Sequence, residues 1–171
     1  MFAQYYATNS KKIKSFAQFS CVCYKDTTDG LGYPYQIVKI LAFFLRYLPN
    51  MRIPLKPPKY RGYRYEEDNA FYKNLTKKHP DVFKANSKML KTLMECFVAK
   101  DSAIKNSITV PTLVFKVLHD RYFSRKYFDK YFQSLTCDKK LVEINGVHNS
   151  YYLDSELFCQ SVYEWFADHS E

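Results

Sequence analysis

Hydrophobic and polar residues follow different periods in different parts of this chain. Aromatic residues at helical spacing predict a short helix over residues 1–8. Residues 15–24, SFAQFSCVCY, form an apolar run without a breaker, which is typical of a strand buried on both faces. Residues 26–35 carry two glycines and a proline and predict a turn-rich loop.

The middle of the chain predicts helices and no strands. An apolar helical pattern covers residues 36–48 and is stopped by Pro49. Three prolines among basic residues predict an irregular surface loop over residues 52–64. Further helices are expected over three ranges: 66–77, 81–93 and 94–99. No strand is predicted between residues 26 and 107.

The last third alternates strand and helix. Strands are predicted over residues 111–118 and 140–144, and helices over residues 124–134 and 155–166. This alternation is the signature of parallel βαβ winding. Because ligands of such sheets bind beyond the carboxyl ends of the strands, the pattern directs attention to the loops that follow the two strands.

Composition narrows the function classes. The chain has 171 residues with 47% hydrophobic and 25% charged, which is enough for a globular domain with a core. Its net charge of +9 is spread without a block of like charges, so we predict no nucleic-acid partner. Five cysteines without zinc-type spacing predict neither a metal site nor a disulfide framework, and no cofactor is expected.

Targeting signals are not found. The first residues lack a basic segment followed by an apolar run, so they do not read as a secretory signal. The longest apolar stretch, residues 37–48, contains Lys39 and Arg46 and is too short to span a bilayer. We therefore expect a cytoplasmic protein, either soluble or peripheral to a membrane.

Asp120 and His148 are the candidate site residues, one in each of the two loops. Leaving adjacent parallel strands, they should meet at one edge of the sheet, where a carboxylate can orient an imidazole as a general base. Each also has a structural interpretation: Asp120 as a turn residue ahead of a helix capped by Ser124, and His148 as a turn histidine satisfied within its own loop. Their joint position favours the catalytic interpretation.

Four segments resemble one enzyme family. Residues 108–115, ITVPTLVF, followed by Asp120, resemble the strand "VPTLLxHGxxD" of the serine aminopeptidase, monoacylglycerol lipase and lysophospholipase group of α/β-hydrolases. Residues 138–148, DKKLVEINGVH, resemble the same group's "DKxLxxxxGxxH", and residues 161–166 its closing "vxxWl" helix. Residues 48–54 are similar to a piece of its cap.

The resemblance implies a fold, a chemistry and site roles. The fold would be α/β: a partial α/β-hydrolase with about three parallel strands, flanking helices and a mostly helical cap. Its parts would be residues 1–25 after the nucleophile, the cap over residues 26–107, and the core over residues 108–171. Asp120 would be the acid and His148 the base of a serine hydrolase that acts on lipid or acyl esters.

This sequence departs from the family at two points. The Gly-x-Ser-x-Gly nucleophile elbow is absent, and the serines present lack the flanking glycines that its strained turn needs. We therefore expect a truncated chain that begins just after its own nucleophile and is inactive alone. In the acid strand, Val117 replaces a family glycine, which would alter the turn that aims Asp120.

Two classes of function follow. The chain is the rear part of a lipase whose front half is supplied elsewhere, or it is a non-catalytic remnant that acts as a binding module. The helix over residues 37–47 either contacts acyl chains and membranes, as the resemblance implies, or covers its own core. The exposed edge of the strand over residues 15–24 would favour self-association.

Overall fold

The chain divides into two units, residues 1–32 with 100–171 and residues 33–99. A computed structural model describes residues 2–19, 34–48, 52–54, 65–81, 84–98, 108–121 and 123–170. The three-part division expected from the sequence stays a prediction.

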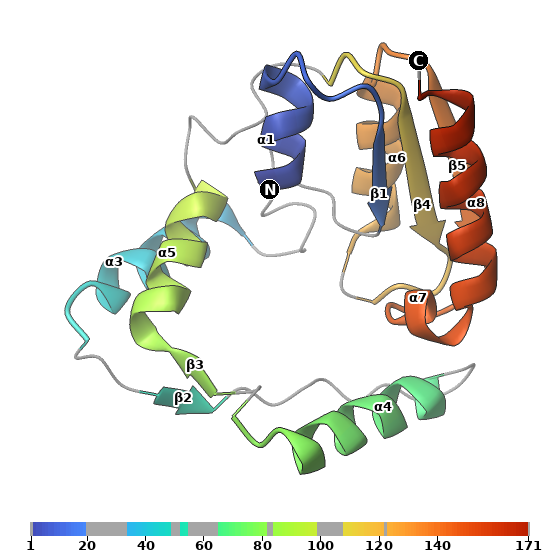
Figure 1. The fold of residues 1–171 in the computed structure, drawn as a ribbon. Helices are drawn as coiled ribbons and strands as arrows, with labels where there is room; N and C mark the ends of the chain where they lie inside the picture. Colours follow the sequence, from blue (N-terminus) through green and yellow to red (C-terminus); the bar gives the residue numbers. More distant parts are fainter. Residues whose placement is uncertain are drawn as a thin grey trace. The chain divides into compact units, whose positions relative to one another are not determined.

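A three-stranded parallel sheet forms the centre of the first unit (Figure 1). Its strands are β1 (Phe16–Phe19), β4 (Thr112–Val117) and β5 (Lys139–Ile144), in the order β1-β4-β5. β4 pairs in parallel with both neighbours. The predicted parallel winding is confirmed. β1 lies within the strand predicted over residues 15–24, of which residues 20–24 fall outside the described part.

Helices lie on both faces of this sheet (Figure 1). They are α1 (Phe2–Asn9), α6 (Arg125–Ser134) and α8 (Ser155–Asp168). The short α7 (Ser150–Leu153) lies beyond the carboxyl ends of the strands (Figure 1). α1, α6 and α8 correspond to predicted helices, whereas the short α7 was not predicted. Ser124 caps α6 as expected, because its side chain accepts a hydrogen bond from the Tyr127 backbone N–H.

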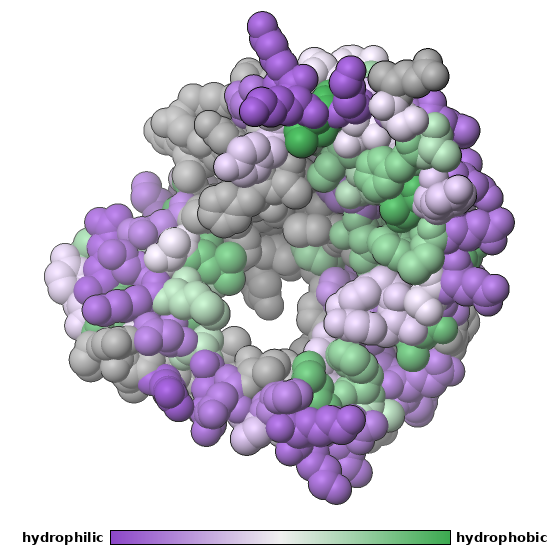
Figure 2. All heavy atoms as spheres, viewed as in Figure 1, coloured by the Kyte–Doolittle hydropathy of each residue, from purple (hydrophilic) through white to green (hydrophobic). Residues whose placement is uncertain are grey.

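The side chains of β4 pack against helices on both faces of the sheet. Val114 packs with Tyr131 of α6 on one face, and Leu113 and Phe115 pack with Trp165 of α8 on the other. Successive residues of a strand point to opposite faces, so the consecutive apolar residues Leu113, Val114 and Phe115 fit burial on both sides. Figure 2 shows hydrophobic residues at the surface over the sheet and α8, bordered by hydrophilic residues.

The second unit is mostly helical but contains a small sheet. Its elements are α3 (Tyr35–Leu45), β2 (Arg52–Pro54), α4 (Tyr65–Lys78), β3 (Lys84–Asn86) and α5 (Ser87–Val98). β2 and β3 pair antiparallel, so the prediction of no strand in this region was wrong. The irregular loop predicted over residues 52–64 was also wrong at residues 52–54, which form β2. Strands of three residues are too short to show alternation, and their pairing partner is remote in sequence.

Two helix boundaries also differ from prediction. The helix expected to start at residue 81 starts at Ser87, because the preceding residues pair with β2 and Asn86 Oδ1 accepts a hydrogen bond from the Lys88 N–H at 2.8 Å. α5 then runs unbroken through Val98. α3 ends at Leu45, three residues early, where Arg46 forms an ion pair of 2.9 Å with Glu95 of α5. Within the described ranges no helix is long and apolar enough to cross a bilayer.

Candidate active site

The loops that follow β4 and β5 lie side by side at the carboxyl edge of the sheet. The Leu118 N–H donates to Ile144 O at 2.9 Å, and the His119 N–H donates to Gly146 O at 3.0 Å. These bonds continue the β4–β5 ladder beyond the strands. The loop that carries the acid is therefore fixed by main-chain contacts to the loop that carries the histidine.

Asp120 and His148 meet between these loops. His148 Nδ1 lies 2.9 Å from Asp120 Oδ2, and the two side chains are 24% and 6% exposed, respectively. An ionised carboxylate can only accept, so Nδ1 carries the hydrogen of this bond. In a neutral imidazole the proton-accepting lone pair is then on Nε2. The histidine is thus bound by the other loop's carboxylate.

Asp120 is itself held in place by its own turn. Its Oδ1 accepts a hydrogen bond from the Phe123 N–H at 3.4 Å, and its N–H donates to Val117 O at 3.4 Å. Asp120 therefore lies in a turn and also forms the hydrogen bond with His148. The Phe123 ring lies 5.8 Å from the His148 ring. Phe123 was not predicted as a site residue, because its contact with the histidine arises only through the fold.

The histidine loop closes on Ser150. The Val147 N–H donates to Ser150 Oγ at 2.8 Å, and the Ser150 N–H returns to Val147 O at 2.9 Å. Ser150 is fully buried. A Cβ at Gly146 would overlap Ser150 Oγ and lie 2.8 Å from Ser150 Cβ. Only glycine fits here, which accounts for the glycine two residues before His148.

A second side-chain contact joins the two loops. His119 Nε2 lies 3.2 Å from Asn145 Oδ1. His119 lies between Asp120 and Val117, the residue that replaces a glycine of the motif that this segment resembles. That departure does not prevent the following Asp120 from reaching His148.

A partly buried cation, Lys116, lies in β4 four residues before Asp120. Lys116 Nζ lies 2.6 Å from Asp129 Oδ1 of α6 and 3.4 Å from Glu143 Oε1 of β5, with its side chain 15% exposed. The hydrogen bond with Asp129 raises the pKa of Lys116 above its ordinary value, although partial burial opposes this. The lysine therefore stays charged and joins three elements. The described residues contain no cluster of three or more His, Cys, Asp or Glu that could hold a metal.

Comparison with known proteins identifies the fold. The sequence matches no protein-family model and no curated protein. Solved structures do match. The monoacylglycerol lipase of Paleococcus ferrophilus is 18% identical with a TM-score of 0.66, covering 98% of this chain and 64% of its own. A soluble variant of monoglyceride lipase from Saccharomyces cerevisiae is 16% identical with a TM-score of 0.62. The match covers 98% of this chain and 61% of the lipase. This chain adopts part of the α/β-hydrolase fold.

A third match widens the comparison within this fold. MGS-M2, an α/β hydrolase from a Medee basin deep-sea metagenome library, is 21% identical with a TM-score of 0.60, covering 97% of this chain and 60% of its own. The chain thus spans about three fifths of the length of the hydrolase structures that it matches. The predicted partial α/β-hydrolase fold is confirmed.

Proposed function

We propose that Asp120 and His148 are the acid and the base of a carboxylic ester hydrolase whose serine comes from a segment outside these 171 residues. The observation that carries this proposal is the 2.9 Å hydrogen bond between His148 Nδ1 and Asp120 Oδ2 at the carboxyl edge of two adjacent parallel strands. The α/β-hydrolase fold supports it. The likeness to two monoacylglycerol lipases suggests a lipid or acyl ester as the substrate.

The chemistry assigns a separate role to each atom. As the serine oxygen attacks the ester carbon, its proton passes to His148 Nε2, and the C=O electron pair moves to oxygen. When the tetrahedral intermediate collapses, the imidazolium returns this proton to the departing alkoxide. Asp120 holds the proton on Nδ1 and stabilises the imidazolium. Water then repeats the two steps in the acyl-enzyme and regenerates the serine.

The 171-residue chain alone is inactive in this proposal. It contains no Gly-x-Ser-x-Gly sequence. Without its nucleophile, a serine hydrolase of this type loses roughly six orders of magnitude in turnover. A fluorophosphonate probe should therefore leave the isolated chain unlabelled, and labelling of any serine in it would contradict this part of the proposal.

The role of the pair can be tested on the chain as it stands. Long-range ¹H–¹⁵N correlation spectra distinguish the two neutral tautomers of histidine. Neutral His148 should carry its hydrogen on Nδ1, and Asp120→Asn should shift the population toward the other tautomer because the amide NH₂ can donate to Nδ1. Asp81→Asn, an exposed acid in the second unit, is the matched control and should leave His148 unchanged. A tautomer population of His148 that is unchanged in Asp120→Asn would contradict the pairing.

Activity tests the second half of the proposal. If the coding sequence continues upstream in frame into a Gly-x-Ser-x-Gly elbow, the longer chain should hydrolyse monoacylglycerols, and Asp120→Asn should lower its turnover about 10⁴-fold. Asp81→Asn should leave turnover unchanged. An elbow-containing chain that hydrolyses esters equally well with Asn at position 120 would overturn the assigned role. Stop codons directly upstream would instead favour the non-catalytic binding module.

A further inference from the structure

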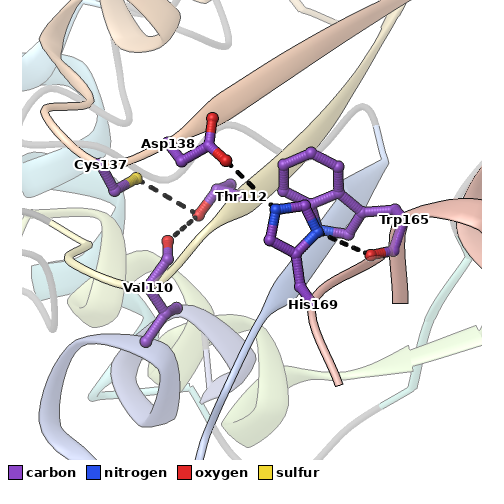
Figure 3. A network of polar contacts seen from close by, with 6 residues as sticks. All are labelled: Val110, Thr112, Cys137, Asp138, Trp165 and His169. Carbon is purple, nitrogen blue, oxygen red and sulfur yellow. Dashed lines mark hydrogen bonds and ion pairs between the residues drawn. The ribbon is translucent and has the colours of Figure 1, made fainter. Parts of the chain in front are cut away.

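A histidine at the far end of α8 lies between two acceptors. His169 Nδ1 is 2.8 Å from Trp165 O, and His169 Nε2 is 3.1 Å from Asp138 Oδ2 (Figure 3). A carbonyl oxygen can only accept, and so can an ionised carboxylate. Neutral imidazole has a single N–H and can satisfy only one of these oxygens. The geometry is therefore complementary to imidazolium, in which both nitrogens donate.

The other possible source of the second hydrogen is a protonated Asp138. The Asp138 side chain is 68% exposed, so burial does not favour its neutral form. Asp168, the last residue of α8, adds a second negative charge near the ring. Among the described residues, these two carboxylates are the charged groups found to act on His169, and both favour its protonated form.

The histidine also stacks on the only tryptophan of the chain. The Trp165 and His169 ring centroids are 3.9 Å apart, with 32° between the ring planes. An aromatic face attracts a cation, so this contact is stronger when His169 is protonated. Trp165 is 5% exposed and packs with Leu113 and Ile144 of the sheet. The protonation state of His169 therefore affects the environment of Trp165, a residue of the hydrophobic core.

Asp138 is fixed to the sheet rather than to α8. The Thr112 N–H donates to Asp138 O at 2.8 Å. Thr112 Oγ1 donates to Val110 O at 2.8 Å and accepts from the thiol of neighbouring Cys137 at 3.7 Å (Figure 3). His169 thus joins the end of α8 to the residue that precedes β5, at the amino edge of the sheet, opposite the Asp120–His148 pair.

We infer that His169 is a proton-dependent clamp: it holds the end of α8 on the sheet while protonated and releases it when it loses its proton. The same contacts raise the pKa of His169 above its ordinary value of 6.5, with the backbone hydrogen bond to Trp165 as the largest cause and Asp138 next. The stabilisation is therefore complete below pH 6.5 and is lost as the pH rises through this raised pKa.

Tryptophan emission tests the clamp on the intact 171-residue chain. A protonated imidazole in contact with an indole quenches its fluorescence, and Trp165 is the only emitter of this kind. Emission should rise as the pH increases between 5.5 and 8.5. His169→Gln should abolish this titration, and Asp138→Asn should lower its midpoint because a stabilising charge is removed. Circular dichroism of each variant checks that it remains folded.

Matched controls separate the clamp from general effects of pH. His79→Gln removes an exposed histidine of the second unit, and Glu156→Gln removes an acid at the opposite end of α8. Both should titrate as the unmodified chain does. Emission of the unmodified chain that stays constant over this pH range, a titration that survives His169→Gln, or a midpoint that ignores Asp138→Asn would each overturn the inference.

Discussion

Single residues that take no part in the proposed reaction position the acid and the base of the candidate site. Ser150 closes the histidine loop through its hydroxyl, and Gly146 leaves the space that this hydroxyl occupies. Phe123 donates its N–H to Asp120 and places its ring beside His148. The acid and the base therefore have their positions fixed by neighbours within a few residues along the chain.

Gly146→Ala should reveal how tightly the histidine loop is packed. The added methyl would overlap Ser150, and overpacking of this kind costs about 1–3 kcal/mol in the free energy of unfolding. Urea unfolding of the purified chain measures this loss. The control is a double-mutant cycle with Ser150→Gly, which removes the atoms that the methyl would meet. The cost of alanine at position 146 should fall in that background, and an equal cost in both would contradict the predicted overlap.

At the scale of elements, α3 differs from the other helices in what it leaves exposed. Val38 and Ala42 are buried, whereas Ile40, Phe43 and Phe44 are 55%, 51% and 61% exposed. The helix therefore has a narrow buried stripe and a broad apolar surface. Exposed basic residues, Lys39 and Arg46, flank this surface. We propose that α3 contacts lipid, as an acyl ester substrate would require.

Vesicle binding tests this proposal for α3. The chain should co-sediment with phosphatidylcholine vesicles that contain an anionic lipid. Phe43→Ser with Phe44→Ser should weaken binding roughly a hundredfold or more, because each buried phenyl contributes about 1.5–3 kcal/mol. Gln36→Ser, an exposed polar position of the same helix, is the matched control. Equal binding of the double variant and the control would rule out a lipid contact through these rings.

At the scale of the whole molecule, the sheet ends at β1 on one side. β1 pairs with β4 along one edge, and no described residue pairs with its other edge. The Phe16 N–H donates to Pro111 O at 2.9 Å, so by alternation the Ala17 N–H points to the unpaired edge. Such an edge is a template for another strand. We propose that the isolated chain self-associates here.

Sizing chromatography with light scattering tests self-association. The apparent mass should rise with concentration, and Ala17→Pro should reduce this rise because proline removes the outward N–H while leaving the β4 side intact. Ala17→Ser keeps the outward N–H at the same position and serves as the control. A chain that stays monomeric over the tested range, or an Ala17→Pro variant that associates as before, would contradict the proposal.

The long elements and the candidate pair could be predicted from the amino-acid sequence. β4 was predictable because a strand buried on both faces reads as one apolar run, and α6 because Ser124 marks its start. Asp120 and His148 could be paired in advance because parallel neighbours end at the same edge. Each of these follows from local pattern or from a rule of topology.

Features that depend on partners remote in sequence could not be predicted and are set by the fold. β2 and β3 are three residues each and exist because they pair with one another, and this pairing also moved the start of α5 to Ser87. The clamp at His169 needs Asp138, which lies 31 positions away in the sequence. A short strand or a lone histidine carries no periodic signal, so its role is set by whatever the fold brings within hydrogen-bonding distance.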